Sequence, residues 1–410
     1  MKIRHAALPL ALAASALAHP AAMGQTSQSH AAHPLGAVTR LDGRVLAPAQ
    51  VAATVERLMR EGRVPGLALA ILNHGEIVYQ HGFGMRDVER GLPLGDTTVM
   101  YAASFTKSMF AYMVMGLVDE GRLDLDRPID CYLPQPLPAY EKYAELAGDE
   151  RWRRITPRML LSHTAGFANF RFIYPDQKLR IEFEPGARYS YSGEGINLLQ
   201  FVMEHGMGMN VDSLMRERVF ERFGMARTQM TWRADFEADH AIGYDTAGTP
   251  LGHRQRTGVR AAGSADSDVA GIARFARGVL RGEGLSPAAR QEMLRPQVRI
   301  RARHQFPTPI AADDTTSRDD GVQLSYGLGW GLIQTPHGPA YFKEGQDEGW
   351  VNYMIAFDQP KTAMVVMMNS INGTRIIATL LAELIGDTWT PAEWDGYAPY
   401  DAHAPPAPAR

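Results

Sequence analysis

The chain has 410 residues, of which 45% are hydrophobic, enough to bury a large core in one big domain or two closely packed ones. Its formal charge of −3 and its dispersed basic residues, 36 Arg and 6 Lys, give no electrostatic footprint for nucleic acid, so we expect no nucleic-acid partner. The single cysteine, Cys131, excludes a disulfide within this chain and a cysteine-based metal site, and we expect it to be a buried hydrophobic side chain.

The N-terminus is typical of a secretory signal peptide. Residues 2–5 are rich in basic side chains, and the apolar residues 6–18 follow them. We therefore predict a signal peptide over residues 1–24, a loose segment over residues 25–44, and a periplasmic or secreted protein. No other stretch approaches the roughly 18 apolar residues of a membrane span, so we expect no transmembrane segment in the mature chain.

The first predicted elements are a helix, a hairpin and a second helix. Residues 47–62 place apolar side chains at the spacing of one helical face and end on glycine. Residues 66–72 and 76–80 are rich in β-forming side chains and are joined by Asn73-His74-Gly75, a typical hairpin turn. The helix predicted over residues 104–121 is apolar enough to be central and buried.

The remaining pattern is mostly helical from about residue 122 to residue 300 and then changes to strands. We predict strands over residues 326–333, 340–343, 350–357 and 362–368, and a closing helix over residues 376–384. Because a hairpin near one end and strands near the other each need partners for their edges, one antiparallel sheet built from both chain ends is the simplest arrangement.

The predicted fold class is therefore α/β of the α+β kind, with an antiparallel sheet formed by both chain ends, flanking helices and an inserted, mostly helical domain. We place the sheet-and-helix part at about residues 45–120 and 300–388, and the insertion at about residues 121–299. Residues 389–410 end in Ala-Pro-Pro-Ala-Pro-Ala-Arg, and we expect them to form a disordered Pro/Ala-rich tail.

Ser104-Phe105-Thr106-Lys107, at the start of the predicted central helix, carries the strongest chemical signal. A serine hydroxyl is a weak nucleophile, and a lysine three residues later lies on the same helical face, close enough to share its proton. With 15 Ser and 6 Lys in the chain, only about 0.2 accidental Ser-x-x-Lys matches are expected. The pair therefore predicts a nucleophile with its base.

Two further segments carry candidate site residues. Tyr191-Ser192-Gly193 lies in a turn-prone loop before a helix, and a tyrosine beside lysines can carry a proton because positive charge favours the phenolate. Lys343-Glu344-Gly345 lies at the end of a predicted strand, where the glycine leaves the backbone open to a substrate. Ser162-His163 is a tempting pair, but no carboxylate stands at a recognisable spacing, so we interpret His163 as structural.

Over roughly residues 45–385, the chain resembles the serine β-lactamase and penicillin-binding-protein superfamily, in the branch with class C β-lactamases, DD-carboxypeptidases and related esterases. Ser104-Phe105-Thr106-Lys107 resembles its Ser-x-x-Lys motif, and Lys343-Glu344-Gly345 resembles its Lys/His-Thr/Gly-Gly element. Tyr191-Ser192-Gly193 resembles its Tyr-x-Asn motif, with glycine in place of asparagine. Ala261-Ala262-Gly263-Ser264 also resembles a family segment.

The resemblance implies that residues 45–388 form a β-lactamase-like serine hydrolase domain that works through an acyl-enzyme on Ser104. It implies a shared base role for Lys107 and Tyr191, and positive charge or hydrogen bonding near the substrate from Lys343. It places the oxyanion between the backbone N–H groups of Ser104 and Gln346. The implied substrate-binding residues are Gly193, Glu344, Gly345 and Gln346, and no metal or cofactor is required.

The substrate stays open at this point. We expect a small molecule or peptide with an ester, amide or lactam carbonyl, and above all ester or D-amino-acid amide or peptide hydrolysis; a true β-lactamase or DD-carboxypeptidase is the alternative. Gly193 lacks the family's side-chain amide and Glu344 puts a carboxylate beside Lys343, which disfavours β-lactam turnover. These departures keep a second class open, a non-catalytic scaffold or ligand sensor. The sequence does not indicate an oligomeric state.

Two other hydrolase classes are disfavoured. The chain has no Gly-x-Ser-x-Gly, the motif of an α/β-hydrolase nucleophile. It also has no His-Glu-x-x-His, the zinc-binding motif of many metallohydrolases.

Overall fold

The computed structural model describes residues 34–306, 308 and 314–400. The predicted signal peptide and residues 25–33 of the predicted loose segment lie outside the described residues. The rest of that segment is not loose, because β1 (Val38–Thr39) pairs with β2 (Val45–Leu46). The Asn73 side chain fixes this hairpin to the sheet, since it accepts a hydrogen bond from the Thr39 N–H and donates one to the Thr39 carbonyl, both at 2.8 Å.

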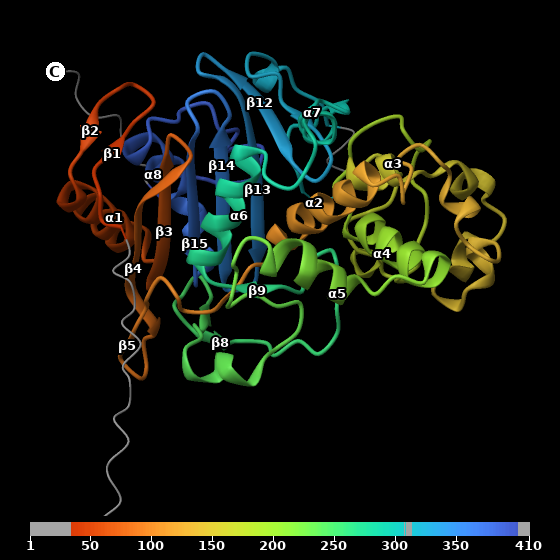
Figure 1. Ribbon diagram of the computed structural model, residues 1–410. Helices are drawn as coiled ribbons and strands as arrows, with labels where there is room; N and C mark the ends of the chain where they lie inside the picture. Colours follow the sequence, from red (N-terminus) through yellow and green to blue (C-terminus); the bar gives the residue numbers. More distant parts are fainter. Residues whose placement is uncertain (1–33, 307, 309–313, 401–410) are drawn as a thin grey trace, which may run out of the picture. The chain divides into compact units, whose positions relative to one another are not determined.

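A nine-stranded antiparallel sheet organises the fold, in the order β10-β11-β12-β13-β14-β15-β3-β4-β5 (Figure 1). Strand β15 pairs with β3, so strands from both ends of the chain meet in one sheet, as predicted. The strands are β3 (Gly66–Asn73), β4 (Glu76–Asp87), β5 (Leu92–Pro93), β10 (Val298–Arg299), β11 (Ser325–Tyr326), β12 (Gly331–Thr335), β13 (Gly338–Asp347), β14 (Trp350–Phe357) and β15 (Thr362–Met368).

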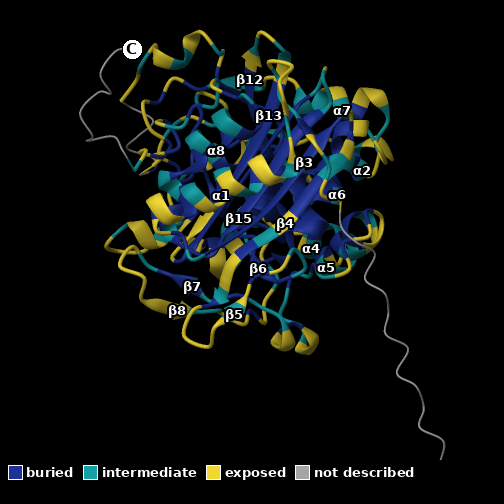
Figure 2. Ribbon diagram, turned by 90° about the vertical axis from the view of Figure 1, so that its left-hand side faces the viewer, coloured by how far each residue is buried: buried dark blue, intermediate teal, exposed yellow. Residues whose placement is uncertain are grey.

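Both faces of the central strands are buried, as Figure 2 shows. Side chains alternate between the faces of a strand. In β3, Leu67, Leu69 and Ile71 therefore join the core formed with α1 (Pro48–Gly62) and α8 (Ile377–Leu384). Ala68 and Ala70 face the other core, where α6 (Val269–Arg281) packs on β3 and β15. The hairpin between β3 and β4 turns at His74 and Gly75, as predicted.

Two strand predictions are wrong in their boundaries. Residues 326–333 do not form one strand, because the chain reverses between β11 and β12, with the Gly327 N–H donating to the Trp330 carbonyl at 2.8 Å. Gly329 lies in this turn with φ +81°, a conformation that favours glycine. Lys343 is not at a strand end, because β13 continues to Asp347.

The chain between the two sets of sheet strands forms helices with short 3₁₀ turns and two small two-stranded sheets. The helices are α2 (Phe105–Asp119), α3 (Pro157–Leu161), α4 (Gly193–Met207), α5 (Val211–Met215), α6 and α7 (Pro287–Leu294). The small sheets pair β6 (Met100–Tyr101) with β9 (Asp266–Ser267) and β7 (Gly243–Tyr244) with β8 (Pro250–Gly252). Cys131 is exposed at the end of a 3₁₀ turn, contrary to expectation.

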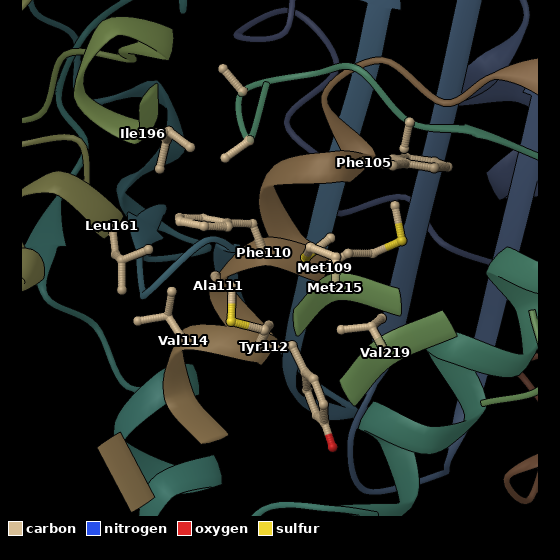
Figure 3. Close-up of a cluster of buried hydrophobic side chains, with 14 of the residues drawn as sticks. Phe105, Met109, Phe110, Ala111, Tyr112, Val114, Leu161, Ile196, Met215 and Val219 are labelled. Atoms are coloured by element: carbon tan, nitrogen blue, oxygen red, sulfur yellow. The ribbon is translucent and has the colours of Figure 1, made fainter. Parts of the chain in front are cut away.

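Helix α2 is the buried centre of the helical layer, as its composition predicts. All its residues from Phe105 to Met115 are buried. Figure 3 shows its side chains packed between Leu161 of α3 and Ile196 of α4 on one side, and Met215 of α5 with Val219 on the other. A helix surrounded in this way holds its first turn in a fixed place relative to the sheet.

The C-terminal segment was predicted to be a disordered tail from residue 389, and this is wrong as far as residue 400. Trp394 and Tyr397 are buried, and their rings contact Phe342 of β13 and Tyr353 of β14. The burial of these two aromatic rings holds the segment on the sheet, although its proline-rich composition is typical of disorder. Residues 401–410 lie outside the described residues. Across the described chain, no helix combines the length and apolar character needed to cross a membrane.

A substitution at Gly329 tests how tightly α2 is packed against the turn between β11 and β12. A Cβ atom at this position would lie 2.3 Å from the Ala111 Cβ, so Gly329→Ala combines a clash with an unfavourable φ. We expect it to lower the free energy of unfolding by about 3 kcal/mol in urea denaturation. Gly248→Ala is the control, because Gly248 has φ +87° and open space around it, and about 1 kcal/mol is expected there. Equal losses in the two variants would contradict the packing argument.

Candidate active site

Ser104 is the residue immediately before α2 and lines the main cavity. Ala103, directly before it, has φ +48°, which is rare for a residue with a side chain. Hydrogen bonds hold this conformation: the Ala102 N–H donates to the Ala265 carbonyl at 3.0 Å, and the Thr106 hydroxyl donates to the Ala103 carbonyl at 2.6 Å. The strained turn therefore fixes Ser104 at the entry of the helix.

Lys107 lies one turn further on, in contact with Ser104. Its Nζ donates to the Ser104 Oγ at 3.0 Å and to the Ala262 carbonyl at 2.5 Å, and the residue is only 1% exposed. Burial, and next the positive charge of Lys343, lower the pKa of Lys107 well below its usual value of 10.5, although Glu344 acts in the opposite direction. The lowered pKa favours the neutral amine, which can accept a proton.

Tyr191 lies between the two lysines. Lys343 Nζ donates to the Tyr191 hydroxyl at 3.2 Å, and the Nζ atoms of Lys107 and Lys343 are 4.9 and 4.8 Å from the centre of its ring. Burial and the negative charge of Glu344 raise the pKa of Tyr191 well above 10, against a lowering effect of its hydrogen bond with Ser104. The prediction that nearby lysines favour the phenolate is therefore wrong, and Tyr191 is a neutral phenol.

His163 positions the loop that carries Tyr191. Its carbonyl accepts a hydrogen bond from the Ser190 N–H at 2.8 Å, and its Nδ1 accepts one from the Ser192 N–H at 3.1 Å. Burial first, and then the neighbouring Lys107 and Lys343, lower the pKa of His163 well below 6.5, so the ring is neutral. These contacts agree with the structural role inferred from the sequence.

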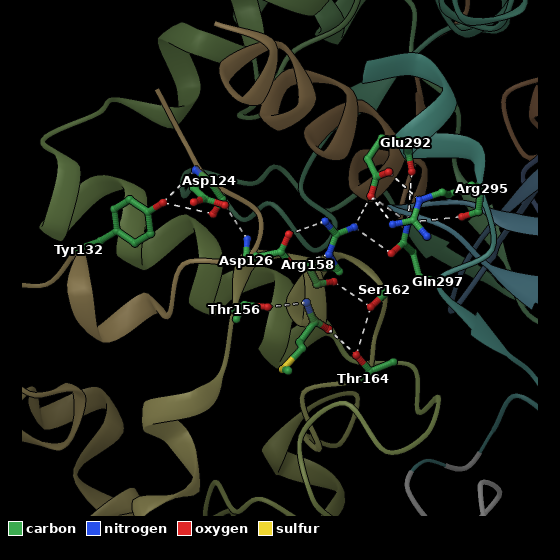
Figure 4. A network of polar contacts seen from close by, with 11 residues as sticks. Asp124, Asp126, Tyr132, Thr156, Arg158, Ser162, Thr164, Glu292, Arg295 and Gln297 are labelled. Atoms are coloured by element: carbon green, nitrogen blue, oxygen red, sulfur yellow. Dashed lines mark hydrogen bonds and ion pairs between the residues drawn. The ribbon is translucent and has the colours of Figure 1, made fainter. Parts of the chain in front are cut away.

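A polar network holds the segment that carries His163 (Figure 4). Arg158 of α3 forms ion pairs with Asp126, at 2.6 Å, and with Glu292 of α7, and it donates to Gln297 at 2.9 Å. The Ser162 hydroxyl donates back to the Arg158 carbonyl at 2.7 Å. The turn after α3 is thereby tied to α7.

Lys343 and Glu344 form a buried ion pair, with side chains 0% and 6% exposed. Neighbouring residues of a regular strand point to opposite faces, yet the long Glu344 side chain reaches the Lys343 Nζ. Gln305 Nε2 also donates to Glu344 Oε1 at 3.2 Å. Burial lowers the pKa of Lys343, and Glu344 opposes that shift, so the carboxylate stabilises the charged lysine.

Gly345 lies where two parts of the chain approach closely. A Cβ atom at Gly345 would lie 2.7 Å from the Ala102 carbonyl oxygen, so the missing side chain makes room for the segment just before the nucleophile. Gln346, the next residue, is exposed and lines the cavity. The glycine thus brings β13 against the start of α2.

Gly193 begins α4 beside an aromatic ring. A Cβ atom at Gly193 would lie 2.5 Å from Phe170 Cε1, and the Gly193 N–H donates to Asn169 Oδ1 at 3.0 Å. The Phe170 ring stacks on Phe172, with centroids 5.2 Å apart. Phe170 therefore occupies the space that a side chain at position 193 would need.

The cavity has a volume of about 810 Å³. Of the predicted site residues, Ser104, Tyr191, Glu344 and Gln346 line it, while Lys107 and Lys343 contact the lining residues from behind. Sequence reasoning missed Asn169, Phe170, Gln305, Phe306 and Asp395, which also line it. Asp395 follows Trp394, which lies in the segment predicted to be a disordered tail. A large aromatic side chain there could have indicated that the segment packs on the core. Within the described residues, no group of three or more His, Cys, Asp or Glu side chains could hold a metal ion.

Comparisons with known proteins identify the family. A family model described as Beta-lactamase matches residues 51–384. The chain is 23% identical over 358 residues to a D-aminopeptidase of Gluconobacter oxydans, covering 84% of this chain and 63% of that protein. It is 28% identical over 211 residues to the esterase EstB of Burkholderia gladioli, covering 45% of this chain and 52% of that protein. The matches thus span less than two thirds of either relative.

Solved structures show the same fold. The octameric penicillin-binding protein homologue from Pyrococcus abyssi superimposes with a TM-score of 0.66 at 21% identity, covering 84% of this chain and 80% of that chain. The family match covers the strained serine, both lysines and the tyrosine loop. The chain therefore belongs to the Beta-lactamase family, whose members are serine hydrolases.

Proposed function

We propose that the protein is a serine acyl-hydrolase that cleaves esters, or amides and peptides of D-amino acids, through an acyl-enzyme on Ser104. The observation that carries this proposal is the contact between the Lys107 amine and the Ser104 hydroxyl, 3.0 Å apart, with the pKa of Lys107 held well below 10.5. The relatives named esterase and D-aminopeptidase support the substrate classes. An inert scaffold would have no need of a neutral buried lysine against its serine.

In the proposed reaction Lys107 is the base. As the Ser104 Oγ attacks the carbonyl carbon, the neutral Lys107 amine takes the hydroxyl proton. Tyr191, a neutral phenol hydrogen-bonded to Ser104, gives its proton to the leaving oxygen or nitrogen and recovers one from the Lys107 ammonium, which took the Ser104 proton. Water then attacks the acyl-enzyme by the reverse of these transfers and frees the acid.

The negative charge of the tetrahedral intermediate is assigned to the N–H groups of Ser104 and Gln346. Ser104 stands at the N-terminus of α2, where the helix dipole favours negative charge. Strand β12 pairs with β13 only as far as Phe342, so it does not cover that edge of β13 at Gln346. The register, with Asp347 opposite Trp350, directs the Gln346 N–H to this uncovered edge.

Glu344 argues for substrates without a carboxylate. It compensates the charge of Lys343, so this lysine offers little net attraction to the carboxylate of a β-lactam or a peptide C-terminus. We therefore place ester and D-amino-acid amide hydrolysis before the β-lactamase and DD-carboxypeptidase alternatives. A panel of p-nitrophenyl esters, D-amino-acid p-nitroanilides and nitrocefin on the purified protein tests this order.

We also propose that the protein acts in the periplasm or outside the cell. The support is the basic and then apolar composition of residues 2–18. N-terminal sequencing of the protein recovered from a periplasmic fraction tests this proposal, and a mature chain that begins near residue 25 is expected. A chain recovered intact from the cytoplasm would contradict it.

The nucleophile is tested by Ser104→Ala. Since no other group can form the acyl-enzyme in this scheme, hydrolysis should fall by up to about 10⁶-fold while the melting temperature stays within a few degrees. A fluorophosphonate probe should label the wild-type chain on Ser104 and leave Ser104→Ala unlabelled, as read by peptide mass spectrometry. An adduct on a different serine, or activity within tenfold of wild type, would contradict the assignment.

The base is tested by Lys107→Arg. A guanidinium stays protonated, so kcat/KM for a neutral ester should fall by about 10³-fold. In the wild type, kcat/KM should rise with pH as Lys107 loses its proton and level off well below pH 10.5, because the pKa of Lys107 is lowered. Lys178→Arg, an exposed substitution, is the control. A loss under tenfold would leave Tyr191 as the base.

The Gly193 departure is tested by a double-mutant cycle. Gly193→Asn restores the family's residue but places its Cβ within 2.5 Å of the Phe170 ring, so about 1–3 kcal/mol of unfolding free energy should be lost. Adding Phe170→Ala should recover about 1 kcal/mol or more relative to the sum of the single changes. Additive losses would show that Phe170 does not exclude the asparagine.

A further inference from the structure

The cavity that contains Ser104 is lined by acidic side chains. Its described lining contains no Lys, Arg or His. The charge of Lys343 is already compensated by its ion pair with Glu344. The potential inside the cavity is therefore negative and favours a positively charged ligand. Besides the paired Glu344, the acidic lining residues are Asp245, Asp347, Glu348 and Asp395.

Three of the lining residues carry buried oxygen acceptors that no described donor reaches. Among the described residues, both carboxylate oxygens of Asp395 lack a hydrogen-bond partner, and so do Glu344 Oε2 and Gln305 Oε1. These residues are 8%, 5% and 2% exposed. Buried acceptors without donors are unfavourable, and here four of them occur along one cavity. This part of the cavity has acceptors in excess and lacks donors.

The structure also orients these acceptors relative to the reacting groups. Gln305 and Lys343 both donate to Glu344 Oε1, which leaves Oε2 as the unpaired oxygen. Lys343 in turn contacts the Tyr191 hydroxyl, so the acceptors lie on the Tyr191 side of Ser104. The Phe306 ring packs edge-on against Tyr191, with centroids 5.4 Å apart, and both aromatic rings line the cavity.

An ammonium group matches these acceptors. It carries a positive charge and three N–H donors, and it is also attracted by aromatic ring faces. A carboxylate in the same place would meet only acceptors and negative charge. We propose that Asp395, with Glu344 and Gln305, forms a subsite that binds the protonated amino group of an acyl substrate. This inference rests on the proposed serine hydrolase function and names its substrate class, amine-bearing esters and amides.

The charge of Asp395 depends on what occupies the cavity. Burial and the nearby Glu344 raise the pKa of Asp395 well above its usual range, and Lys343 opposes them only in part. A bound ammonium group would stabilise the carboxylate and lower this pKa again. A protonated Asp395 with no ligand is the competing explanation for its unpaired oxygens. It leaves Gln305 Oε1 unexplained and predicts no preference for amines.

The test compares D-alanine benzyl ester with N-acetyl-D-alanine benzyl ester, which differ in the charge and the size of one group, and the Asp395→Asn variant isolates the effect of charge. The wild type should show a kcat/KM at least tenfold higher for the free amine. Asp395→Asn keeps the shape and removes the negative charge, and it should reduce this ratio to less than threefold. Asp347→Asn is the matched control, because it removes an exposed carboxylate from the same cavity and should leave most of the preference.

Each failure has its own signature. If p-nitrophenyl butyrate is not hydrolysed and Ser104 is not labelled, the proposed function fails. If butyrate is hydrolysed but the wild type shows no amine preference, only the subsite fails. The subsite would also be overturned if Asp395→Asn left the ratio of kcat/KM for the two esters unchanged, or if Asp347→Asn lowered this ratio as much as Asp395→Asn does.

A binding measurement tests the proposal even if the protein does not hydrolyse these esters or if the Asp395→Asn variant does not fold. Calorimetry with the wild type should show benzylamine binding at least tenfold more tightly than benzyl alcohol. Equal binding of the two would overturn the subsite. Gln305→Leu removes one acceptor without changing the charge, and it should weaken benzylamine binding more than benzyl alcohol binding.

Discussion

Two lysine amines lie against the same tyrosine ring in a buried site, 4.9 and 4.8 Å from its centre, and like charges at this depth repel strongly. Burial disfavours the charged form of all three groups, and Glu344 adds to this effect or opposes it at each of them. Its carboxylate contacts Lys343 and stabilises the proton there, whereas burial and the charge of Lys343 lower the pKa of Lys107 beside Ser104. Burial first, and then the same carboxylate, raise the pKa of Tyr191. Burial and one ion pair together therefore bias the protonation states of the three groups beside the nucleophile.

The fold supplies the rigidity that this arrangement needs. Lys107 belongs to a helix that is buried from Phe105 to Met115, and Ser104 stands immediately before it. Lys343 and Glu344 belong to the middle of a ten-residue strand. Gly345 allows the strand and the start of the helix to approach closely. Tyr191 comes from a loop, but hydrogen bonds to His163 on both sides of it fix its place. Short distances are thus maintained between groups far apart in the sequence.

The parts of the fold that follow from local pattern were predictable. The first helix, the β3–β4 hairpin and the sheet built from both chain ends follow from periodicity and from the need to cover strand edges. The break between β11 and β12 was missed, because Gly329 was counted inside a strand. The packed C-terminal segment was missed because its proline-rich composition was weighed above two buried aromatics, Trp394 and Tyr397. Composition reports the average of a segment, whereas packing depends on a few anchors.

For the site, the sequence could indicate which residue types belong together but not their charge states. The state of Tyr191 depends first on its burial and then on the charge of Glu344, and no spacing in the sequence reveals either. The Phe170 ring against Gly193 and the cavity position of Asp395 likewise arise only from tertiary structure. The glycine at 193 and the carboxylate at 344, which depart from the family pattern, are therefore parts of a differently arranged pocket. They leave the Ser104–Lys107 contact intact.

The charge assignment of the two lysines can be measured directly by NMR with ¹³C-labelled lysine. The chain has only 6 Lys, and the signals of Lys107 and Lys343 can be assigned from single Lys→Arg variants. Our account predicts that Lys107 titrates well below 10.5 and below Lys343. It further predicts that Glu344→Gln lowers the pKa of both lysines, because Glu344 raises each of them. A Lys107 that titrates near 10.5, or above Lys343, would contradict the account.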